Sequence, residues 1–255
     1  MMKTPISYYG GKMRLAKRIS DLLPANYAYV EAFAGSAAVL LSREPSKLEV
    51  LNDLDGEVYN FWKVLREEPD SLVSLLERTP YSKEEYLECR IGSVDQNPLE
   101  RARRFFVKAN MAFGASLTTV GYSSGSLGKS SKPAIFISKV EMLEDVARRL
   151  RGVELQNEDA LRLINRFDSP RTSLYLDPPY LGSTRSSSND YIVDNASLEF
   201  HESLISRLKD FSGNAVLSGY AHPLYEELGW LRIDIDVHAP SSGAGRRTEC
   251  LWVNL

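Results

Sequence analysis

Hydrophobic residues gather along the chain in short runs that are separated by polar segments. Short runs of this kind, bounded by polar or turn-forming residues, predict buried strands. The predicted strands are residues 29–33, 47–51, 153–156, 173–176, 215–218, 231–237 and 249–253. They fall into two groups, one before residue 52 and one after residue 152, with a different kind of segment between them.

Apolar residues at helical spacing occupy much of the chain between these strands. In residues 55–66, for example, Val58, Phe61, Trp62 and Leu65 lie on one face of a predicted helix. Further helices are predicted at residues 13–22, 37–42, 159–166 and 197–211. Strands that alternate with helices predict an α/β fold, with a largely parallel sheet and helices on both faces.

The segment from residue 67 to residue 150 follows another pattern. Helices are predicted at 70–78, 83–90, 98–112 and 138–150, around a centre at 113–133 that is rich in Gly and Ser. Such a centre is typical of a mobile loop or a twisted hairpin. We therefore expect residues 1–66 and 151–255 to form one domain, and residues 67–150 to form a mainly helical insertion.

Composition excludes several classes of protein. The chain has 255 residues and no apolar run of the roughly 18 residues that span a membrane. The N-terminal residues lack the apolar stretch of a secretory signal. Cys89 and Cys250 lie far apart, and His201, His222 and His238 are scattered, so neither a disulfide framework nor a metal site is expected. A cytoplasmic setting is the default expectation.

Charge is unevenly distributed, although the net charge is only −3. Residues 96–152 contain ten Lys or Arg against four Asp or Glu, which gives +6 and leaves −9 for the remainder. A basic segment on an acidic body is compatible with phosphate binding, and the Gly- and Ser-rich centre is the part expected to order on a polyanion. Solvated helix faces explain the same charges equally well.

Asp177-Pro178-Pro179-Tyr180 is the motif with the clearest chemistry, and it directly follows the predicted strand at 173–176. The Asp177 carboxylate and the Pro178 carbonyl can each accept a hydrogen bond from an exocyclic amine. The prolines fix the backbone, and Tyr180 offers a ring face for stacking. This arrangement suits methylation of the amino group of a nucleobase. A bare strand-ending turn is the structural alternative.

Tyr8-Tyr9-Gly10-Gly11-Lys12 precedes the first predicted helix. Paired glycines allow a ligand to approach the backbone closely, and Lys12 supplies a cation beside them. The motif lacks the spacing of a phosphate-binding P-loop. Taken alone, it is more often a plain turn.

Two further motifs stand at predicted strand ends, where open α/β sheets bind ligands. Glu31-Ala32-Phe33-Ala34-Gly35-Ser36 is a strand-to-helix turn without the spacing of a dinucleotide fingerprint, which disfavours a nicotinamide cofactor. Asn52-Asp53 ends the next strand, where an acid suits ribose hydroxyls. An ordinary helix N-cap explains Asp53 about as well.

The order of these four motifs resembles the Dam-like (class alpha) family of DNA adenine methyltransferases. Residues 104–114 and 247–252 are further matches. The resemblance spans nearly the whole chain and is weakest at 67–100 and 115–135, where the family varies with its target sequence. It implies a Rossmann-like seven-stranded methyltransferase sheet that uses S-adenosylmethionine, with an inserted target-recognition domain.

The resemblance also implies roles for individual residues. The catalytic set is Asp177, Pro178, Pro179 and Tyr180. The cofactor contacts are Tyr8, Gly10, Gly11, Lys12, Glu31, Phe33, Gly35, Ser36, Asp53, Asp159 and Asp177. Glu158 is an alternative to Asp159, and either residue can instead cap a helix. No metal is implied.

Double-stranded DNA is the partner that the resemblance implies, with the target adenine flipped out of the helix. The candidates for DNA contacts are Arg101, Arg103, Arg104, Lys108, Lys129 and Lys132. The loop at 118–129 is a candidate for entering a groove. Residues 183–194 either close over the flipped base or form a disordered connector. A companion restriction endonuclease is possible, and a monomer or weak dimer is expected.

Three other functions stay open from the sequence. Adenine in RNA and cytosine in DNA are alternative substrates, although cytosine enzymes of this kind usually carry Ser where Asp177 stands. A non-catalytic DNA-binding relative of a methyltransferase is the alternative of a different class. The intact set of four motifs argues against it.

Overall fold

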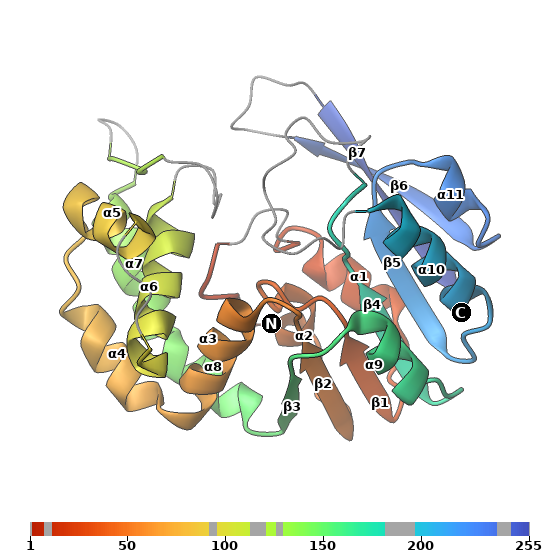
Figure 1. Ribbon diagram of the computed structural model, residues 1–255, viewed down its shortest axis with the longest axis horizontal. Coiled ribbons are helices and arrows are strands. Elements are labelled where there is room, and N and C mark those ends of the chain that lie inside the picture. Colours follow the sequence, from red (N-terminus) through yellow and green to blue (C-terminus); the bar gives the residue numbers. More distant parts are fainter. Residues whose placement is uncertain are drawn as a thin grey trace.

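The structure is a computed structural model that describes residues 2–7, 12–91, 96–112, 121–125, 130–181, 197–238 and 246–254, without the side chains of 237–238 and 246–247. A seven-stranded sheet lies beside a lobe of helices (Figure 1). No described helix has both the length and the apolar character needed to cross a membrane.

The sheet contains each strand that the hydrophobic pattern predicts. Its strands are β1 (Ala28–Glu31), β2 (Leu48–Asn52), β3 (Val153–Gln156), β4 (Thr172–Leu176), β5 (Asn214–Gly219), β6 (Leu231–His238) and β7 (Arg246–Asn254). Their order is β3-β2-β1-β4-β5-β7-β6. β1 to β5 are parallel, and β7 is antiparallel to both neighbours. The predicted α/β fold and its seven-stranded sheet are confirmed.

Helices cover both faces of this sheet. One face carries α9 (Ala160–Arg166), α10 (Leu198–Lys209) and α11 (Pro223–Glu226), and the other carries α1 (Ala16–Leu22), α2 (Ala38–Ser42) and α3 (Gly56–Glu67). Val30 and Leu174 pack in the core with α9 and α10. Tyr29 and Tyr175, their neighbours along the strands, pack in the core with α1 and α2. This alternation follows from the two-residue period of a strand.

The helical lobe contains α4 (Pro69–Glu77), α5 (Lys83–Ile91), α6 (Pro98–Met111), α7 (Lys132–Glu141) and α8 (Leu143–Leu150). The single helix predicted at 138–150 is wrong in its extent, because the chain forms two helices that meet at Met142. The first of them begins earlier because the Ser131 side chain accepts a hydrogen bond from the Ala134 amide and Pro133 occupies the first turn. Both features favour a helix start.

Helix α3 connects the lobe to the sheet. Its Phe61 ring packs against Phe105 and Phe106 of α6, with centroids 5.4 and 6.2 Å apart. The neighbouring Trp62 donates its indole N–H to the Gly35 carbonyl beyond β1, at 3.1 Å. The lobe and one sheet face therefore share a core. The division into residues 1–66 with 151–255 and residues 67–150 stays a prediction.

Strand order reverses between the adjacent strands β1 and β4. After β1 the chain continues to β2 on one side, and after β4 it continues to β5 on the other side, toward the opposite edge of the sheet. At such a point the connections after the two strands diverge and leave a crevice at their carboxyl ends. Glu31 ends β1 and Asp177 directly follows β4. The fold thus brings two of the predicted site residues to the edge where α/β proteins bind ligands.

Candidate active site at the carboxyl ends of β1 and β4

Asp177 stands at the centre of this edge, with its side chain 20% exposed. Its Oδ1 atom accepts a hydrogen bond from the Ser218 hydroxyl of β5 at 2.8 Å. The same oxygen lies 2.9 Å from the Lys12 Nζ. Strand β5 and the segment before α1 therefore orient the carboxylate through one oxygen.

Lys12 lies inside this cluster, only 6% exposed. Its Nζ lies 3.1 Å from the Glu249 Oε1 and donates to the Tyr180 hydroxyl at 2.7 Å. The sequence assigns Lys12 to the cofactor, whereas its described contacts are with the predicted catalytic turn and with Glu249 of β7. A buried ammonium needs carboxylate partners, and here it has two.

Tyr180 is fixed at both ends of its side chain. Its hydroxyl donates to Glu249, and its ring packs edge-on against Tyr220 with centroids 4.6 Å apart. Burial, with Asp177 and Glu249 nearby, raises the pKa of Tyr180 well above its usual value. The phenol therefore stays protonated and acts as a donor.

A buried histidine holds the turn from behind. His201 Nε2 lies 2.9 Å from the Pro179 carbonyl oxygen. Because a carbonyl can only accept, Nε2 carries the proton, and the other ring nitrogen accepts from the Tyr225 hydroxyl at 2.9 Å. His201 is fully buried, so α10 and α11 together fix the backbone of the Pro-Pro turn.

The turn after β1 is held against β2 and α3. Gly35 has φ +42°, a conformation that glycine adopts without steric cost. Its amide donates to the Asp53 Oδ2 at 2.8 Å, and the Ala34 amide donates to the Asn52 carbonyl at 2.7 Å. The buried Asn52 side chain also donates to the Ala32 carbonyl at 2.9 Å. These bonds give the turn one defined shape.

Asp53 is not the helix cap that the sequence left as an alternative. Asp55 caps α3, since its side chain accepts from the Glu57 amide at 2.8 Å. Asp53 instead accepts from the amides of Gly35 and Asp55, one at each oxygen. Burial raises its pKa to about 6.

Glu31 is buried at the end of β1. Its Oε2 accepts from the Tyr29 hydroxyl at 2.9 Å and from the Leu40 amide of α2 at 3.0 Å. Burial raises the pKa of Glu31 to about 8, although both hydrogen bonds oppose this.

Phe33 and Ser36 lie in the turn after β1. Phe33 packs edge-on against Phe200 of α10, with centroids 6.2 Å apart, and Ser36 is buried.

Asp159 and Glu158 each have a structural partner. Asp159 caps α9 by accepting from the Arg162 amide at 3.1 Å. Glu158 lies 2.6 Å from the guanidinium of Arg166. The capping interpretation therefore describes Asp159 well, and its contact with a cofactor stays a prediction.

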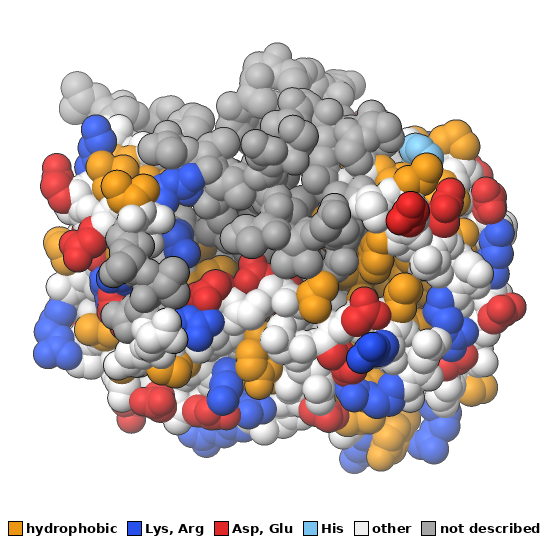
Figure 2. All heavy atoms as spheres, viewed as in Figure 1, with side chains coloured by type: hydrophobic (Ala, Val, Ile, Leu, Met, Phe, Trp, Pro, Cys, Tyr) orange, Lys and Arg blue, Asp and Glu red, His pale blue; other side chains and the backbone are white. Residues whose placement is uncertain are grey.

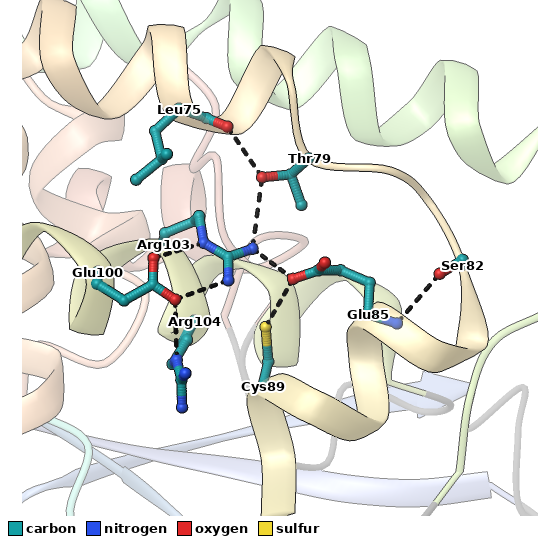
Figure 3. A network of polar contacts seen from close by, with 8 residues as sticks. All are labelled: Leu75, Thr79, Ser82, Glu85, Cys89, Glu100, Arg103 and Arg104. Carbon is teal, nitrogen blue, oxygen red and sulfur yellow. Dashed lines mark hydrogen bonds and ion pairs between the residues drawn. The ribbon is translucent and has the colours of Figure 1, made fainter. Parts of the chain in front are cut away.

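Three of the described basic candidates form ion pairs, and two of them, Arg103 and Arg104, do so within the lobe (Figure 3). Arg103 is 11% exposed and lies between Glu85 of α5 and Glu100. Arg104 also binds Glu100, at 2.9 Å. Arg101 binds Glu57 of α3 at 2.6 Å. The enclosed position of Arg103 argues against a phosphate contact.

Lys108 and Lys132 lie partly exposed on α6 and α7. On the face drawn in Figure 2, the described Lys and Arg side chains are interspersed with Asp and Glu. Tyr8, Gly10, Gly11 and Lys129 lie outside the described residues, as does the segment 183–194. Of the loop at 118–129, only residues 121–125 are described.

Four residues of the site escaped the sequence analysis: Asn52 as a brace, His201, Ser218 and Glu249. Glu249 belongs to the closing segment 247–252, which carried the family resemblance without a role. Ser218 ends a predicted strand, a position that could have drawn attention to it. Nothing in the sequence distinguishes His201 from an ordinary buried histidine. Within the described residues, no three His, Cys, Asp or Glu side chains form a possible metal site.

Comparison with known proteins identifies the family. The family model for D12 class N6 adenine-specific DNA methyltransferases matches residues 8–228. The chain is 27% identical to the Type II methyltransferase M1.LlaDCHI of Lactococcus lactis subsp. cremoris, over 96% of this chain and 93% of that protein. It is 26% identical to the DNA N-6-adenine-methyltransferase of Escherichia phage P1, over 79% of this chain and 27% of that protein.

Among solved structures, precorrin 8W decarboxylase of Methanobacterium thermoautotrophicum matches over all of both chains, at 9% identity and a TM-score of 0.42. The assignment depends instead on the family match, which covers all four sequence motifs and the elements that position Asp177. The chain therefore belongs to the D12 class N6 adenine-specific DNA methyltransferase family.

Proposed function

We propose that Asp177, Pro178 and Tyr180 carry the transfer of a methyl group from S-adenosylmethionine to the 6-amino group of an adenine flipped out of duplex DNA. One observation carries the proposal: Asp177 stands at the switch point of the sheet, with Oδ1 bound by Lys12 and Ser218. We assign its other oxygen, Oδ2, to the adenine amine.

The strand-end residues suit S-adenosylmethionine chemically. Glu31, Asp53 and Asp177 are carboxylates at the ends of β1, β2 and β4. They complement a ligand that carries an ammonium group, ribose hydroxyls and a sulfonium cation. The turn with Gly35 in the left-handed region lets such a ligand approach the backbone. We therefore assign Asp53 to the ribose and Glu31, Phe33, Gly35 and Ser36 to the methionine end.

The amine of adenine is a poor nucleophile because its lone pair is delocalised into the ring. The Asp177 carboxylate and the Pro178 carbonyl accept its two hydrogens, which favours a pyramidal nitrogen with the lone pair directed at the methyl donor. S-adenosylmethionine supplies an electrophilic methyl group on a sulfonium sulfur when bound. As positive charge develops on the nitrogen, the fixed carboxylate of Asp177 stabilises it.

Tyr180 stacks on the extruded adenine before methyl transfer begins. Extrusion of a paired adenine costs a few kcal/mol, and stacking on an aromatic ring returns about 1–3 kcal/mol per base. Tyr220 and Glu249 hold the Tyr180 ring in place, so little side-chain entropy is lost on stacking.

Lys108 and Lys132 of the helical lobe are the described candidates for phosphate contacts. A companion restriction endonuclease is proposed from the relative in Lactococcus.

Asp177→Ala tests this proposal. The variant should bind S-adenosylmethionine and DNA but lose turnover by about 100-fold or more, because one fixed group is removed from the developing charge. Labelled cofactor, duplex DNA and nucleoside analysis measure the N6-methyladenine product, with single-stranded DNA and RNA in parallel. Asp210→Ala, at an exposed carboxylate that ends α10, is the control. Near-normal turnover of Asp177→Ala would overturn the role.

A further inference from the structure

Glu249 is a second carboxylate of the active site, contributed by the antiparallel strand β7. Its side chain is 10% exposed and reaches the site because β7 pairs with β5 beside Ser218. It binds the Lys12 ammonium, with 3.1 Å between Oε1 and Nζ. It also accepts a hydrogen bond from the Tyr180 hydroxyl. Neither the substrate nor the cofactor role assigned above uses this residue.

Lys12 creates an electrostatic difficulty for the proposed reaction. Methyl transfer moves one positive charge from sulfur to the adenine nitrogen, and Asp177 is the anion that stabilises it. An ammonium only 2.9 Å from Asp177 cancels much of that anion's potential. Buried charges interact strongly because little water screens them. A Lys12–Asp177 pair alone would therefore weaken the group on which the chemistry depends.

Glu249 resolves the difficulty through charge balance. With Asp177 and Glu249 ionised and Lys12 protonated, the three side chains carry one net negative charge. That charge matches the single positive charge that passes between donor and acceptor. Because Lys12 is shared between two carboxylates, Asp177 keeps a net attraction for the developing cation.

We propose that Glu249 is a positioning residue for methyl transfer: it draws the Lys12 charge away from Asp177 and fixes the Tyr180 ring through its hydroxyl. This inference rests on the proposed function, since it assumes that Asp177 faces the reacting nitrogen. It goes beyond it by assigning a role to a carboxylate outside the Asp-Pro-Pro-Tyr motif.

Among the described residues, the titratable groups that face Glu249 are Lys12 before α1, and Asp177, Tyr180 and Tyr175 on β4 and the turn after it. Glu31 on β1 acts on the cluster through Asp177. Burial raises the pKa of Glu249, with Asp177 adding to the effect and Lys12 opposing it. Glu249 should therefore lose its charge at a higher pH than an ordinary glutamate.

The test is Glu249→Gln, which keeps an acceptor oxygen for Tyr180 and Lys12 but removes the charge. We expect kcat to fall about tenfold or more, with the KM for duplex DNA unchanged within about twofold. In the wild type, kcat should decline at acidic pH as Glu249 becomes protonated. That decline should be absent or shifted to lower pH in Glu249→Gln, a change that a merely structural role does not produce.

Asp234→Asn is the matched control, because it removes one carboxylate from the same strand pair at a side chain that is 52% exposed. Glu249→Asp keeps the charge, so it should retain the acidic decline even with lower kcat; this variant also carries the test if Glu249→Gln fails to fold. An acidic decline that is the same in wild type and Glu249→Gln, or lost in Glu249→Asp, overturns the inference. If Asp177→Ala also keeps turnover, the proposed function fails instead.

Discussion

At the scale of single residues, the carboxyl groups of the site differ in how much their burial costs. Asp177 is partly exposed and has Lys12 as a cation beside it. Glu31 is 2% exposed, and its Oε2 accepts hydrogen bonds from the Tyr29 phenol and the Leu40 amide. A buried carboxyl favours its neutral form when nearby cations do not offset its burial, and at Glu31 the lowering of the pKa by Arg43 is smaller than the rise caused by burial. An ionised Glu31 therefore destabilises the folded protein.

The stability of the protein should therefore depend on pH through Glu31. Its folded pKa of about 8 lies above the usual 4.5, so the folded state binds a proton that the unfolded state has lost. This contribution is fully present below pH 4.5 and is lost as the pH rises to about 8. At pH 8, Glu31→Gln should therefore have a higher free energy of unfolding than the wild type, by on the order of a few kcal/mol, and should unfold at a higher temperature.

Calorimetry without cofactor at pH 5 and pH 8 measures this difference. Gln retains an oxygen for the Tyr29 hydroxyl and the Leu40 amide, so the comparison isolates the charge. If stability changed with pH in the same way in both proteins, Glu31 would not be the group responsible for the pH dependence.

Sequence reasoning found the residues of this site more readily than their contacts. Asp177 is recognisable because it ends an apolar strand with two prolines and a tyrosine after it. Lys12 was assigned to the cofactor, since a Gly-Gly-Lys turn carries no information about which distant carboxylate it meets. Its contacts with Asp177 and Glu249 depend on three separate parts of the chain, which only the folded sheet brings together.

At the scale of elements, the arginine-rich helix α6 acts largely as a packing element. The sequence places Arg101, Arg103 and Arg104 among the DNA contacts because of their charge. In the structure their partners are Glu57, Glu85 and Glu100, which come from three different helices. Charge counted along a sequence does not reveal such cross-helix pairs, so the basic segment is less available to a polyanion than its sum of +6 indicates.

Arg103→Ala should destabilise the helical lobe. The guanidinium of Arg103 bonds to Glu85, Glu100 and Thr79, and Glu85 also accepts from the Cys89 thiol at 3.1 Å. Removal of the guanidinium takes the cation away from Glu85, whereas Glu100 keeps Arg104. The loss of one partner of a buried pair costs about 3–5 kcal/mol. Urea unfolding measures the loss, and faster labelling of the buried Cys89 locates it in α5.

Arg148→Ala is the control for this change. Arg148 pairs with Asp145 on α8, where the two side chains are 62% and 60% exposed. Exposed pairs contribute little, so stability should be nearly unchanged. If Arg103→Ala unfolds like the wild type but weakens DNA binding, the arginine is a phosphate contact after all.

At the scale of the whole molecule, the strand order could not be predicted from the hydrophobic pattern. The pattern finds the buried strands because they are short apolar runs, finds β6 because apolar and charged residues alternate along it, and the βα alternation implies a parallel sheet. The position of β7 between β5 and β6 depends on pairing between Trp252 and Leu217 and between Trp252 and Arg232. Local periodicity contains no such information, yet this insertion is what carries Glu249 into the site.

The helical lobe and the segment that leads to Lys12 are fastened together. Lys139 of α7 donates to the Ser7 hydroxyl at 2.5 Å and to the Asn110 Oδ1 of α6 at 2.6 Å. The Ser7 amide also binds the Asn110 Oδ1, at 3.1 Å, and the Asn110 side chain donates to the Pro5 carbonyl at 3.3 Å. The lobe therefore anchors Pro5 and Ser7, and Lys12 lies five residues after Ser7.

This junction should make stability depend on alkaline pH. Burial, with Lys132 nearby, lowers the pKa of Lys139 from 10.5 to about 8. The folded state then binds fewer protons than the unfolded state, so the Lys139 contribution rises between pH 8 and 10.5. Lys139→Gln should lack this rise in urea unfolding, whereas Lys17→Gln, at an exposed lysine paired with Asp21, should keep it. Equal slopes for wild type and Lys139→Gln would show that the charge of Lys139 does not alter the stability of this junction.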